Sequence, residues 1–323
     1  MSVSLSTRAR AALLAAFLAA WVAGSVLGAG EHESAGATPM FQIGPAHAEY
    51  VPALNGEEPI FILVMASDAR TDQEVNGQRA DSLHIVSVNP AAGKATIVGI
   101  PRDSYVTIPD HGTNKINAAL ALGGPQLVVA TVEELTGLTM DYWAITGFGG
   151  FRAMVEQIGG LVVDVPFAMD DASANAYFEP GVQRLSGDDS LAFARNRHDL
   201  PAGDFGRSEN QGVLLISALA QLRREFVQNP SRVLDWIGAF KRNAQTAVPI
   251  DELVNLAFTA TTLNPKKVVN IVTPGSSGMV GDSSIVNLDM AQLQAISTDL
   301  ADDGLLNKVT IPPSPNAPLL EGA

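Results

Sequence analysis

Four charged residues stand just outside two short apolar segments of the sequence: Arg79, Asp81, Arg102 and Asp103. The segments, residues 83–88 and 95–100, are rich in β-branched side chains, and the Asn-Pro-Ala-Ala-Gly-Lys between them is typical of a turn. This pattern predicts an antiparallel hairpin. Because a hairpin brings its two outer ends together, we expect both Arg/Asp pairs at one edge of a sheet.

A second stretch, LAFARNRHDLPAGDFGRSENQG at 191–212, carries three arginines and a glutamine: Arg195, Arg197, Arg207 and Gln211. Ser186 can cap a helix that ends near Arg195, and the next helix is expected to begin at Arg207, with Gln211 one turn further on the same face. The four side chains can therefore surround one small volume.

Guanidinium groups bind phosphate oxygens in a bidentate way, so this arginine cluster is suited to a phosphate or a pyrophosphate. The same arginines could instead neutralise helix C-termini and nearby acids such as Asp199 and Asp204. The stretch by itself leaves both interpretations open.

The elements that must position these residues alternate between strand and helix patterns. Residues 60–65 form a continuous apolar run, which predicts a buried central strand that ends just before Asp68 and Arg70. Further strands are expected at 142–145 and 161–165, and helices at 124–135, 149–158, 186–194, 207–226, 251–258 and 289–300. The pattern predicts a three-layer α-β-α domain of the α/β class over residues 57–305, with a mixed central sheet because of the hairpin.

Composition excludes several classes of protein and site. The chain has 323 residues and a formal net charge of −14, which argues against a nucleic-acid-binding protein that relies on a broad basic surface. An anionic ligand must therefore be held by a local cluster of cations. The absence of cysteine excludes disulfides, thiolate metal sites and cysteine nucleophiles.

The N-terminal segment predicts a membrane location. Residues 11–30 carry no charge, and as a helix they would span the roughly 30 Å core of a bilayer. Arg8 and Arg10 precede them, so we expect residues 1–10 in the cytoplasm, a single-pass anchor in the cell membrane, and an extracytoplasmic linker at 31–56. A cleaved signal peptide is the alternative, because small residues at 27–30 suit a peptidase. Residues 306–323 are expected to form a flexible tail.

Taken together, six short motifs resemble the ordered motif set of the LytR-CpsA-Psr family. They are SDAR at 67–70, RADSL at 79–83, IPRDSYV at 100–106, KINAA at 115–119, ARNR at 194–197 and DFGRSENQ at 204–211. The resemblance covers roughly residues 58–300.

The resemblance implies a phosphotransferase that moves a glycopolymer from a polyprenyl-pyrophosphate carrier to peptidoglycan, assisted by Mg²⁺ or by Mn²⁺ in its place. It implies that Asp68 and Asp81 hold the metal, and that Asp81, Arg102 and Asp103 act in catalysis, with Asp103 as a candidate base for the acceptor hydroxyl. The residues implied to bind pyrophosphate are Arg79, Arg102, Arg195, Arg197, Arg207 and Gln211. A pyrophosphatase and a non-catalytic carrier-binding protein are the alternatives.

One departure from the family pattern and several other residues bear on these roles. Asn210 stands where the family often has arginine, so one guanidinium is missing. Asp103 could be an ion-pair partner of Arg102 instead of a base, because a carboxylate beside guanidinium has a lowered pKa. Lys115 and Asn117 are expected to support the sheet edge. The two histidines His84 and His198 lack metal-ligand spacing and are expected to be structural.

Overall fold

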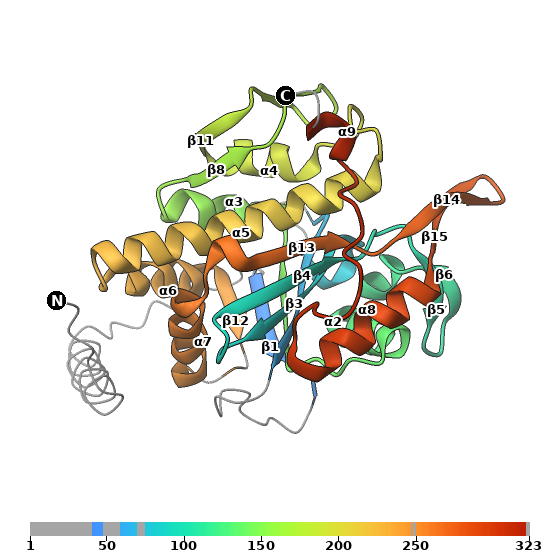
Figure 1. Cartoon of the computed structure of the whole chain (residues 1–323), viewed down its shortest axis with the longest axis horizontal. Coiled ribbons are helices and arrows are strands. Elements are labelled where there is room, and N and C mark those ends of the chain that lie inside the picture. Colours follow the sequence, from blue (N-terminus) through green and yellow to red (C-terminus); the bar gives the residue numbers. More distant parts are fainter. Residues whose placement is uncertain (1–40, 48–58, 70–74, 247, 249, 321–323) are drawn as a thin grey trace. The chain divides into compact units, whose positions relative to one another are not determined.

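The structure is a computed structural model that describes residues 41–47, 59–69, 75–246, 248 and 250–320. Its centre is a seven-stranded sheet with the order β12-β1-β7-β2-β3-β4-β13 (Figure 1). The strands are β1 (Phe41–Pro45), β2 (Ile60–Ser67), β3 (Ala80–Asn89), β4 (Lys94–Gly99), β7 (Tyr142–Thr146), β12 (Ala244–Thr246) and β13 (Val268–Val272).

The sheet is mixed, as the sequence predicts. The hairpin of β3 and β4 is antiparallel, and β3 is also antiparallel to β2, whereas β2 and β7 are parallel and so are β4 and β13. Strand β3 begins at Ala80, earlier than expected, so Asp81 lies within the strand. The register between β2 and β3 shifts at Ala66 and Ser67, just before Asp68 leaves the sheet.

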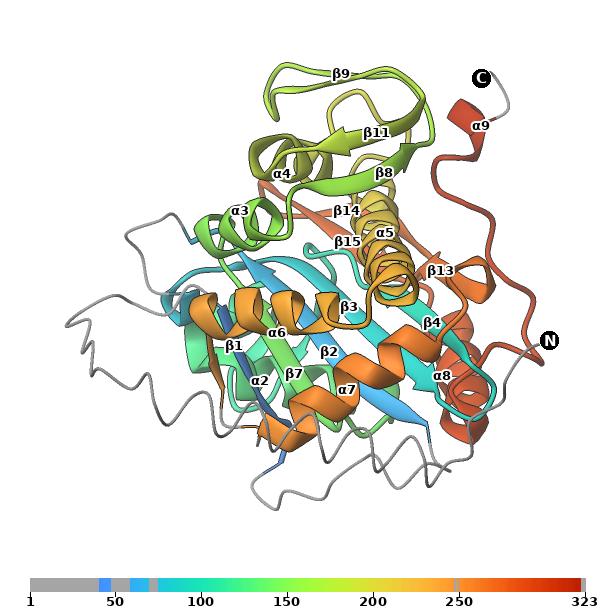
Figure 2. The same cartoon turned by 90° about the vertical axis from the view of Figure 1, so that its left-hand side faces the viewer.

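Helices cover both faces of the sheet (Figure 2). Phe61, Leu63 and Met65 of β2 belong to a core shared with α2 (Ala118–Thr136) and α8 (Met290–Asp303). Their neighbours Ile60 and Ile62 pack instead with residues of α5 (Asp204–Gln228) and α7 (Ile250–Thr262). Alternate side chains of a strand point to opposite faces, which is why one apolar run can serve two cores.

The remaining helices and short hairpins are arranged around this centre. The helices are α3 (Phe148–Gln157), α4 (Gly187–Arg195), α6 (Arg232–Asn243) and α9 (Ala317–Leu320), and short 3-10 turns lie at Val75–Gly77 and Pro265–Lys267. The two-stranded pairs are β5 (Tyr105–Ile108) with β6 (Gly112–Lys115), β8 (Leu161–Val165) with β11 (Gly181–Leu185), β9 (Met169–Asp171) with β10 (Ala176–Phe178), and β14 (Gly275–Val280) with β15 (Ser283–Leu288). The strand predicted at 161–165 is thus outside the central sheet, because its apolar side chains pack in a second core with Phe193 of α4 and Leu214 of α5.

Two helices differ from their predicted limits for identifiable reasons. Helix α2 begins at Ala118 and is kinked at Gly123 and Gly124, and Gly124 has the positive φ of +69° that glycine adopts readily. Helix α5 begins at Asp204 after Gly203, so Arg207 lies one turn inside it. Helix α4 has the predicted cap, since the Ser186 hydroxyl accepts a hydrogen bond from the Asp189 backbone N–H.

The two ends of the chain bear on three further predictions. The proposed cytoplasmic residues 1–10, the anchor at 11–30 and most of the linker at 31–56 lie outside the described residues. Among the residues that are described, no helix has the length and apolar character needed to cross a bilayer. The sequence predicts a flexible tail at 306–323; in its described part, the backbone N–H groups of residues 307–309 donate to Asp299 of α8, and Ser314 and Asn316 are bonded to α5.

Hydrogen bonds account for the position of this C-terminal segment. The Glu209 carboxylate of α5 accepts from the Ser314 hydroxyl at 2.8 Å and from the Asn316 backbone N–H at 3.1 Å. The Asn316 amide donates to the Gly206 carbonyl at 3.1 Å and to the side-chain oxygen of Asn210 at 3.2 Å. Asn210, which replaces the arginine expected from the family, therefore binds this segment.

Candidate active site

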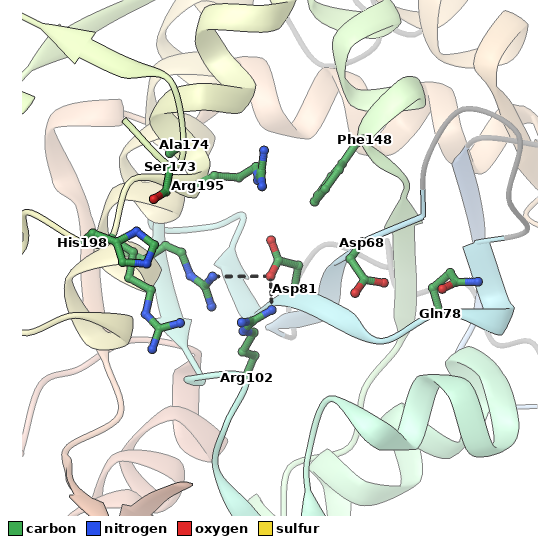
Figure 3. A pocket seen from close by; sticks show the side chains of 11 residues that line it. Asp68, Gln78, Asp81, Arg102, Phe148, Ser173, Ala174, Arg195 and His198 are labelled. Carbon is green, nitrogen blue, oxygen red and sulfur yellow. Dashed lines mark hydrogen bonds and ion pairs between the residues drawn. The ribbon is translucent and has the colours of Figure 1, made fainter. Parts of the chain in front are cut away.

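A polar cavity of about 480 Å³ opens at the edge of the sheet where the hairpin strands and α4 and α5 meet (Figure 3). We call it the cationic cavity. The residues that line it are Asp68, Gln78, Asp81, Arg102, Phe148, Ser173, Ala174, Arg195, Arg197, His198 and Arg207. They come from the end of β2, from β3, from the turn after β4, and from α3, α4, α5 and the loops between them.

Asp81 is the centre of an ion-pair network in this cavity. Its Oδ1 accepts from Nη1 of Arg102 at 2.6 Å and from Nη1 of Arg207 at 3.4 Å. Figure 3 shows the contact of Asp81 with Arg102 as a dashed line. Arg102 reaches Asp81 because the hairpin returns the chain to the start of β3. The predicted meeting of the two hairpin ends is therefore confirmed for Arg102 and Asp81.

A second buried carboxylate, Asp204, lies close to Arg207 and Arg102 and also to Arg197. Its Oδ1 lies 2.5 Å from Nη2 of Arg207, 3.8 Å from Nε of Arg197 and 4.0 Å from Nε of Arg102. Burial lowers the pKa of the Arg207 guanidinium, whereas Asp81 and Asp204 on either side of it act in the opposite direction. The pKa of Arg207 is nevertheless below its ordinary value, so the two carboxylates offset only part of the cost of burying this cation.

Arginines outnumber carboxylates around the cationic cavity. Four guanidiniums, those of Arg102, Arg195, Arg197 and Arg207, line it together with two carboxylates, those of Asp68 and Asp81. Arg195 lies over an aromatic ring, with its guanidinium carbon 5.2 Å from the centroid of Phe148. In a chain with a net charge of −14, this local excess of cations is suited to an anionic ligand.

The two predicted metal ligands, Asp68 and Asp81, both line the cationic cavity. Asp68 is fixed by Arg79, since its Oδ1 accepts from the Arg79 backbone N–H at 3.1 Å. The exposed Arg79 side chain is not among the lining residues of this cavity. Within the described part of the chain no three metal-ligating side chains come together. A pair of carboxylates still fits Mg²⁺, which takes its other ligands from substrate phosphates and water.

An apolar cavity of about 330 Å³ adjoins the cationic one. It lies between the sheet and helices α3, α5 and α6, and its walls include Met154, Leu214, Leu215, Ala218 and Trp236. Three residues line both cavities, namely Asp81, Phe148 and Arg195.

Gln211 and His84 line the apolar cavity next to Asp81. The Gln211 amide donates to the Ala194 carbonyl at 3.1 Å and lines the apolar cavity but not the cationic one. His84 is buried, and its Nε2 donates to the Ser208 carbonyl at 3.0 Å while Nδ1 accepts from the Ser82 hydroxyl at 3.0 Å. Burial lowers the pKa of His84 to about 4, although the bond to Ser208 acts in the opposite direction. The predicted structural role of His84 agrees with these contacts.

Asp103 lies in a different cavity, of about 580 Å³, which we call the side cavity. Nζ of Lys115 lies 3.3 Å from the Oδ1 of Asp103, and the Asn117 amide donates to the same oxygen at 3.4 Å. Asp103 is thus paired with Lys115 and not with Arg102, and the expected supporting role of Lys115 and Asn117 agrees with these contacts. Arg197 and His198 line both the cationic and the side cavity.

Comparison with known proteins agrees with this geometry. The profile of the LytR_cpsA_psr family matches residues 31–302. The chain belongs to the LytR-CpsA-Psr family. The resemblance of its motifs to that family is therefore confirmed, and so is an α/β fold with a mixed central sheet.

Individual members of the LytR-CpsA-Psr family show how far the similarity extends. The chain is 32% identical to the polyisoprenyl-teichoic acid–peptidoglycan teichoic acid transferase TagU of Bacillus mycoides (strain KBAB4), over 63% of this chain and 65% of that protein. It is also 32% identical to TagV of Bacillus subtilis (strain 168), over 71% of this chain and 60% of the relative. The matches thus span less than two thirds of the length of these curated relatives.

Solved structures of the LytR-CpsA-Psr family share the fold. The crystal structure of B. subtilis TagV superimposes with a TM-score of 0.65 and 27% identity, covering 77% of this chain and 98% of that chain. A structure of the family protein YwtF (TagT) with bound octaprenyl pyrophosphate gives a TM-score of 0.59 at 22% identity. The match covers 84% of this chain and 97% of that chain.

Three features of this LytR-CpsA-Psr site were not found by sequence reasoning. Asp204 was considered only as a neutralising acid, although it binds Arg207 inside the site. Phe148 has no motif signal, because its ring matters only through its position under Arg195. His198 lacks metal-ligand spacing, yet it lies at the boundary of two cavities.

Proposed function

We propose that the chain is a phosphotransferase that moves a glycopolymer from a polyprenyl-pyrophosphate carrier to peptidoglycan. The observation that carries this proposal is the shared wall of Asp81, Phe148 and Arg195 between the cationic and the apolar cavity. A ligand that fills both must be anionic at one end and apolar at the other. A prenyl diphosphate has this character, and it is the class of ligand bound in the TagT structure.

The reaction requires one bond to form and one to break. The oxygen of an acceptor hydroxyl attacks the phosphorus that carries the glycan, the bond from this phosphorus to the prenyl phosphate breaks, and the hydroxyl proton leaves. Arg102, Arg195, Arg197 and Arg207 stabilise the charge on the transferred phosphoryl group and on the departing prenyl phosphate. Gln211 links the end of α4 to β3, because its amide donates to the carbonyls of Ala194 and Asp81. We propose that the exposed Arg79 side chain acts only at the entrance of the cationic cavity.

Asp68 and Asp81 are the residues that would hold Mg²⁺, or Mn²⁺, in this site. Oδ1 of Asp81 is engaged by two arginines, so its other carboxylate oxygen is the one available to a cation. A bound dication neutralises diphosphate charge, which complements the arginines. Asp68→Asn keeps the shape of the side chain but removes an anion, and we expect turnover to fall together with its dependence on added metal.

We also propose that residues 11–30 anchor the protein in the cell membrane with the catalytic domain outside. This location would bring the apolar cavity to a lipid-linked substrate. The full-length protein is then expected to resist alkaline and high-salt extraction from membranes, with protease access to the domain only from outside. A soluble mature form that begins near residue 31 would identify a cleaved signal peptide instead.

The test of the proposed reaction supplies a lipid-linked oligosaccharide with and without a peptidoglycan acceptor. The phosphorus-containing products are then identified. Sugar phosphate joined to the acceptor supports the transferase. Free sugar phosphate that forms at the same rate with or without acceptor would indicate a hydrolase, and tight binding without any metal-dependent product would indicate a carrier-binding protein.

A further inference from the structure

A buried carboxylate holds an exposed histidine at the boundary of the cationic and side cavities. The Asp171 side chain, 1% exposed, accepts backbone N–H bonds from Ser173 and Ala174 on Oδ1 and from Arg197 and His198 on Oδ2, at 2.9–3.2 Å. Nδ1 of His198 lies 3.2 Å from both carboxylate oxygens. The His198 side chain is nevertheless 65% exposed.

These contacts fix which ring nitrogen carries the proton. Burial raises the pKa of Asp171, but the backbone N–H groups of His198 and Arg197 outweigh it and hold the pKa well below its ordinary value. An ionised carboxylate only accepts hydrogen bonds, so Nδ1 of His198 must be the donor. In the neutral ring Nε2 is then left with a free lone pair, which is the arrangement of a histidine that serves as a base.

The position of His198 connects two cavities of different character. It lines the cationic cavity together with the four arginines proposed to bind the diphosphate. It also lines the side cavity, together with Ser276, Ser277 and Ser284. Serine hydroxyls are hydrogen-bonding groups suited to a saccharide. A sugar hydroxyl in the side cavity would lie beside His198 and Arg197, the two residues that this cavity shares with the cationic one.

The carboxylates of the two cavities are less suited to accept a proton. Asp81 and Asp204 are paired with guanidiniums, and Asp103 is paired with Lys115. A cation bound to a carboxylate oxygen occupies the lone pairs that would accept the proton of a hydroxyl. Asp68 remains, and it is the proposed metal ligand.

On this basis we propose that His198 is the general base that takes the proton from the acceptor hydroxyl, and that Asp171 is its positioning residue. The inference rests on the proposed phosphotransferase function. As the hydroxyl oxygen attacks phosphorus, Nε2 of His198 takes its proton, the prenyl phosphate leaves with the electrons of the broken phosphorus–oxygen bond, and the imidazolium later gives the proton to solvent.

Charged groups of both signs surround the imidazole of His198, beginning with the Asp171 carboxylate 3.2 Å from Nδ1. Those that line the cavities with His198 are Arg195 at the end of α4, Arg197 in the same loop, Arg207 and Asp204 in α5, Arg102 and Asp103 beyond β4, Asp81 in β3 and Asp68 after β2, and Asp199 follows His198 in the chain. A protonated imidazole has no free lone pair on Nε2 and cannot serve as a base. The rate is therefore expected to fall on the acid side of the pH profile.

The test compares the wild-type protein with His198→Gln and Asp171→Asn, using lipid-linked oligosaccharide, acceptor and Mg²⁺ at about pH 6 to 9. His198→Gln is expected to lower kcat on the order of 10²–10³-fold, within the range for general-base catalysis, and to remove the acid limb of the profile. The Kd for a prenyl diphosphate should stay unchanged, because the arginines remain. His111→Gln, an exposed histidine that lines neither cavity, is the matched control and should behave as wild type.

Asp171→Asn tests the positioning role separately. It is expected to lower kcat less than His198→Gln does and to alter the acid limb without changing the prenyl diphosphate Kd. Because Asp171 also accepts four backbone N–H bonds, the unfolding curve of Asp171→Asn is measured in parallel. If that variant is unfolded, His198→Gln tests the inference on its own, because it keeps those bonds. Wild-type kcat with an intact acid limb in His198→Gln would overturn the inference. Hydrolysis by the wild-type protein would overturn the proposed function alone, since the same variants then report on proton removal from water.

Discussion

Helix α5 presents one face to two cavities of opposite character. Near its start Arg207 lines the cationic cavity, and further along Leu214, Leu215 and Ala218 line the apolar cavity. These residues recur at helical spacing, and Arg207 and Ala218 are roughly 16 Å apart along the axis at about 1.5 Å per residue. The first region is built from ion pairs between specific atoms, whereas the second is lined mainly by apolar side chains that make non-directional contacts. Changes in the first should therefore alter stability and turnover, and changes in the second should alter affinity for long lipids.

The largest effect is expected where the charged region is most buried. Arg207→Met leaves the carboxylates of Asp81 and Asp204 buried and without their strongest common partner, which should lower the free energy of unfolding by about 3–5 kcal/mol. Denaturant titration measures this change. Arg152→Met, which removes an exposed pair with Asp188, is the control and should cost about 0–1 kcal/mol. Equal losses for both variants would contradict the contrast between buried and exposed pairs.

A pH-dependent effect is expected from His84, below the charged region. Burial lowers its pKa from 6.5 to about 4, so folding favours the neutral ring. Its contribution is therefore complete above pH 6.5 and is lost as the pH falls toward 4, by about 3 kcal/mol in total. In His84→Gln the free energy of unfolding should fall less over this range than in wild type, whereas His111→Gln should follow wild type. Parallel pH curves for wild type and His84→Gln would exclude this role.

Replacement of a guanidinium by an ammonium should affect turnover at constant charge. Arg195→Lys loses the planar group that lies over Phe148 and can bind phosphate oxygens in a bidentate way. We expect a loss of about 1.5–3 kcal/mol in transition-state stabilisation, measured as kcat/KM with a lipid-linked substrate. Arg184→Lys, at an arginine that binds the carbonyls of Gly159 and Gly160 away from the three cavities, should leave kcat/KM unchanged. Wild-type kcat/KM in Arg195→Lys would favour a purely structural role for this arginine.

The smallest effect is expected in the apolar region and only for long lipids. Ala218→Phe fills part of a cavity of about 330 Å³. The Kd for a long prenyl diphosphate should rise about tenfold, which corresponds to about 1.4 kcal/mol, while that for a five-carbon prenyl diphosphate stays the same. Val227→Phe, at an exposed position near the end of the same helix, controls for added bulk. A similar rise for both lipids would indicate distortion of α5 instead of a filled lipid site.

Much of the central fold could be predicted because its signals are local. The run at 60–65, the turn between β3 and β4 and the cap at Ser186 each depend on residues close in sequence. Strand β13 could not be predicted in this way, because its parallel pairing with β4 joins Val268 to Ala95. Strand β8 has the right pattern but lies outside the central sheet, since the core that receives it is formed by residues far along the chain.

The candidate site shows the same limit. The residue types of the arginine cluster and the hairpin ends identify the anion-binding edge, and the structure brings Arg102, Arg207 and Asp81 together there. The partner of Asp103 could not be inferred, because either Arg102 or Lys115 could serve. The contact of Asp171 with His198 depends partly on backbone N–H groups, which are the same for every residue type except proline.

The C-terminal segment that binds α5 also has a consequence for folding kinetics. The contact of Asn316 with Asn210 closes a loop of 106 positions, and the bond of Ser87 to Gly304 spans 217. Contacts between residues so far apart require the chain to lose much entropy before they stabilise it, and proteins that depend on them fold slowly. We therefore expect the first turns of α5, which carry Arg207, to acquire these partners late in folding, after the hairpin and the local helices have formed.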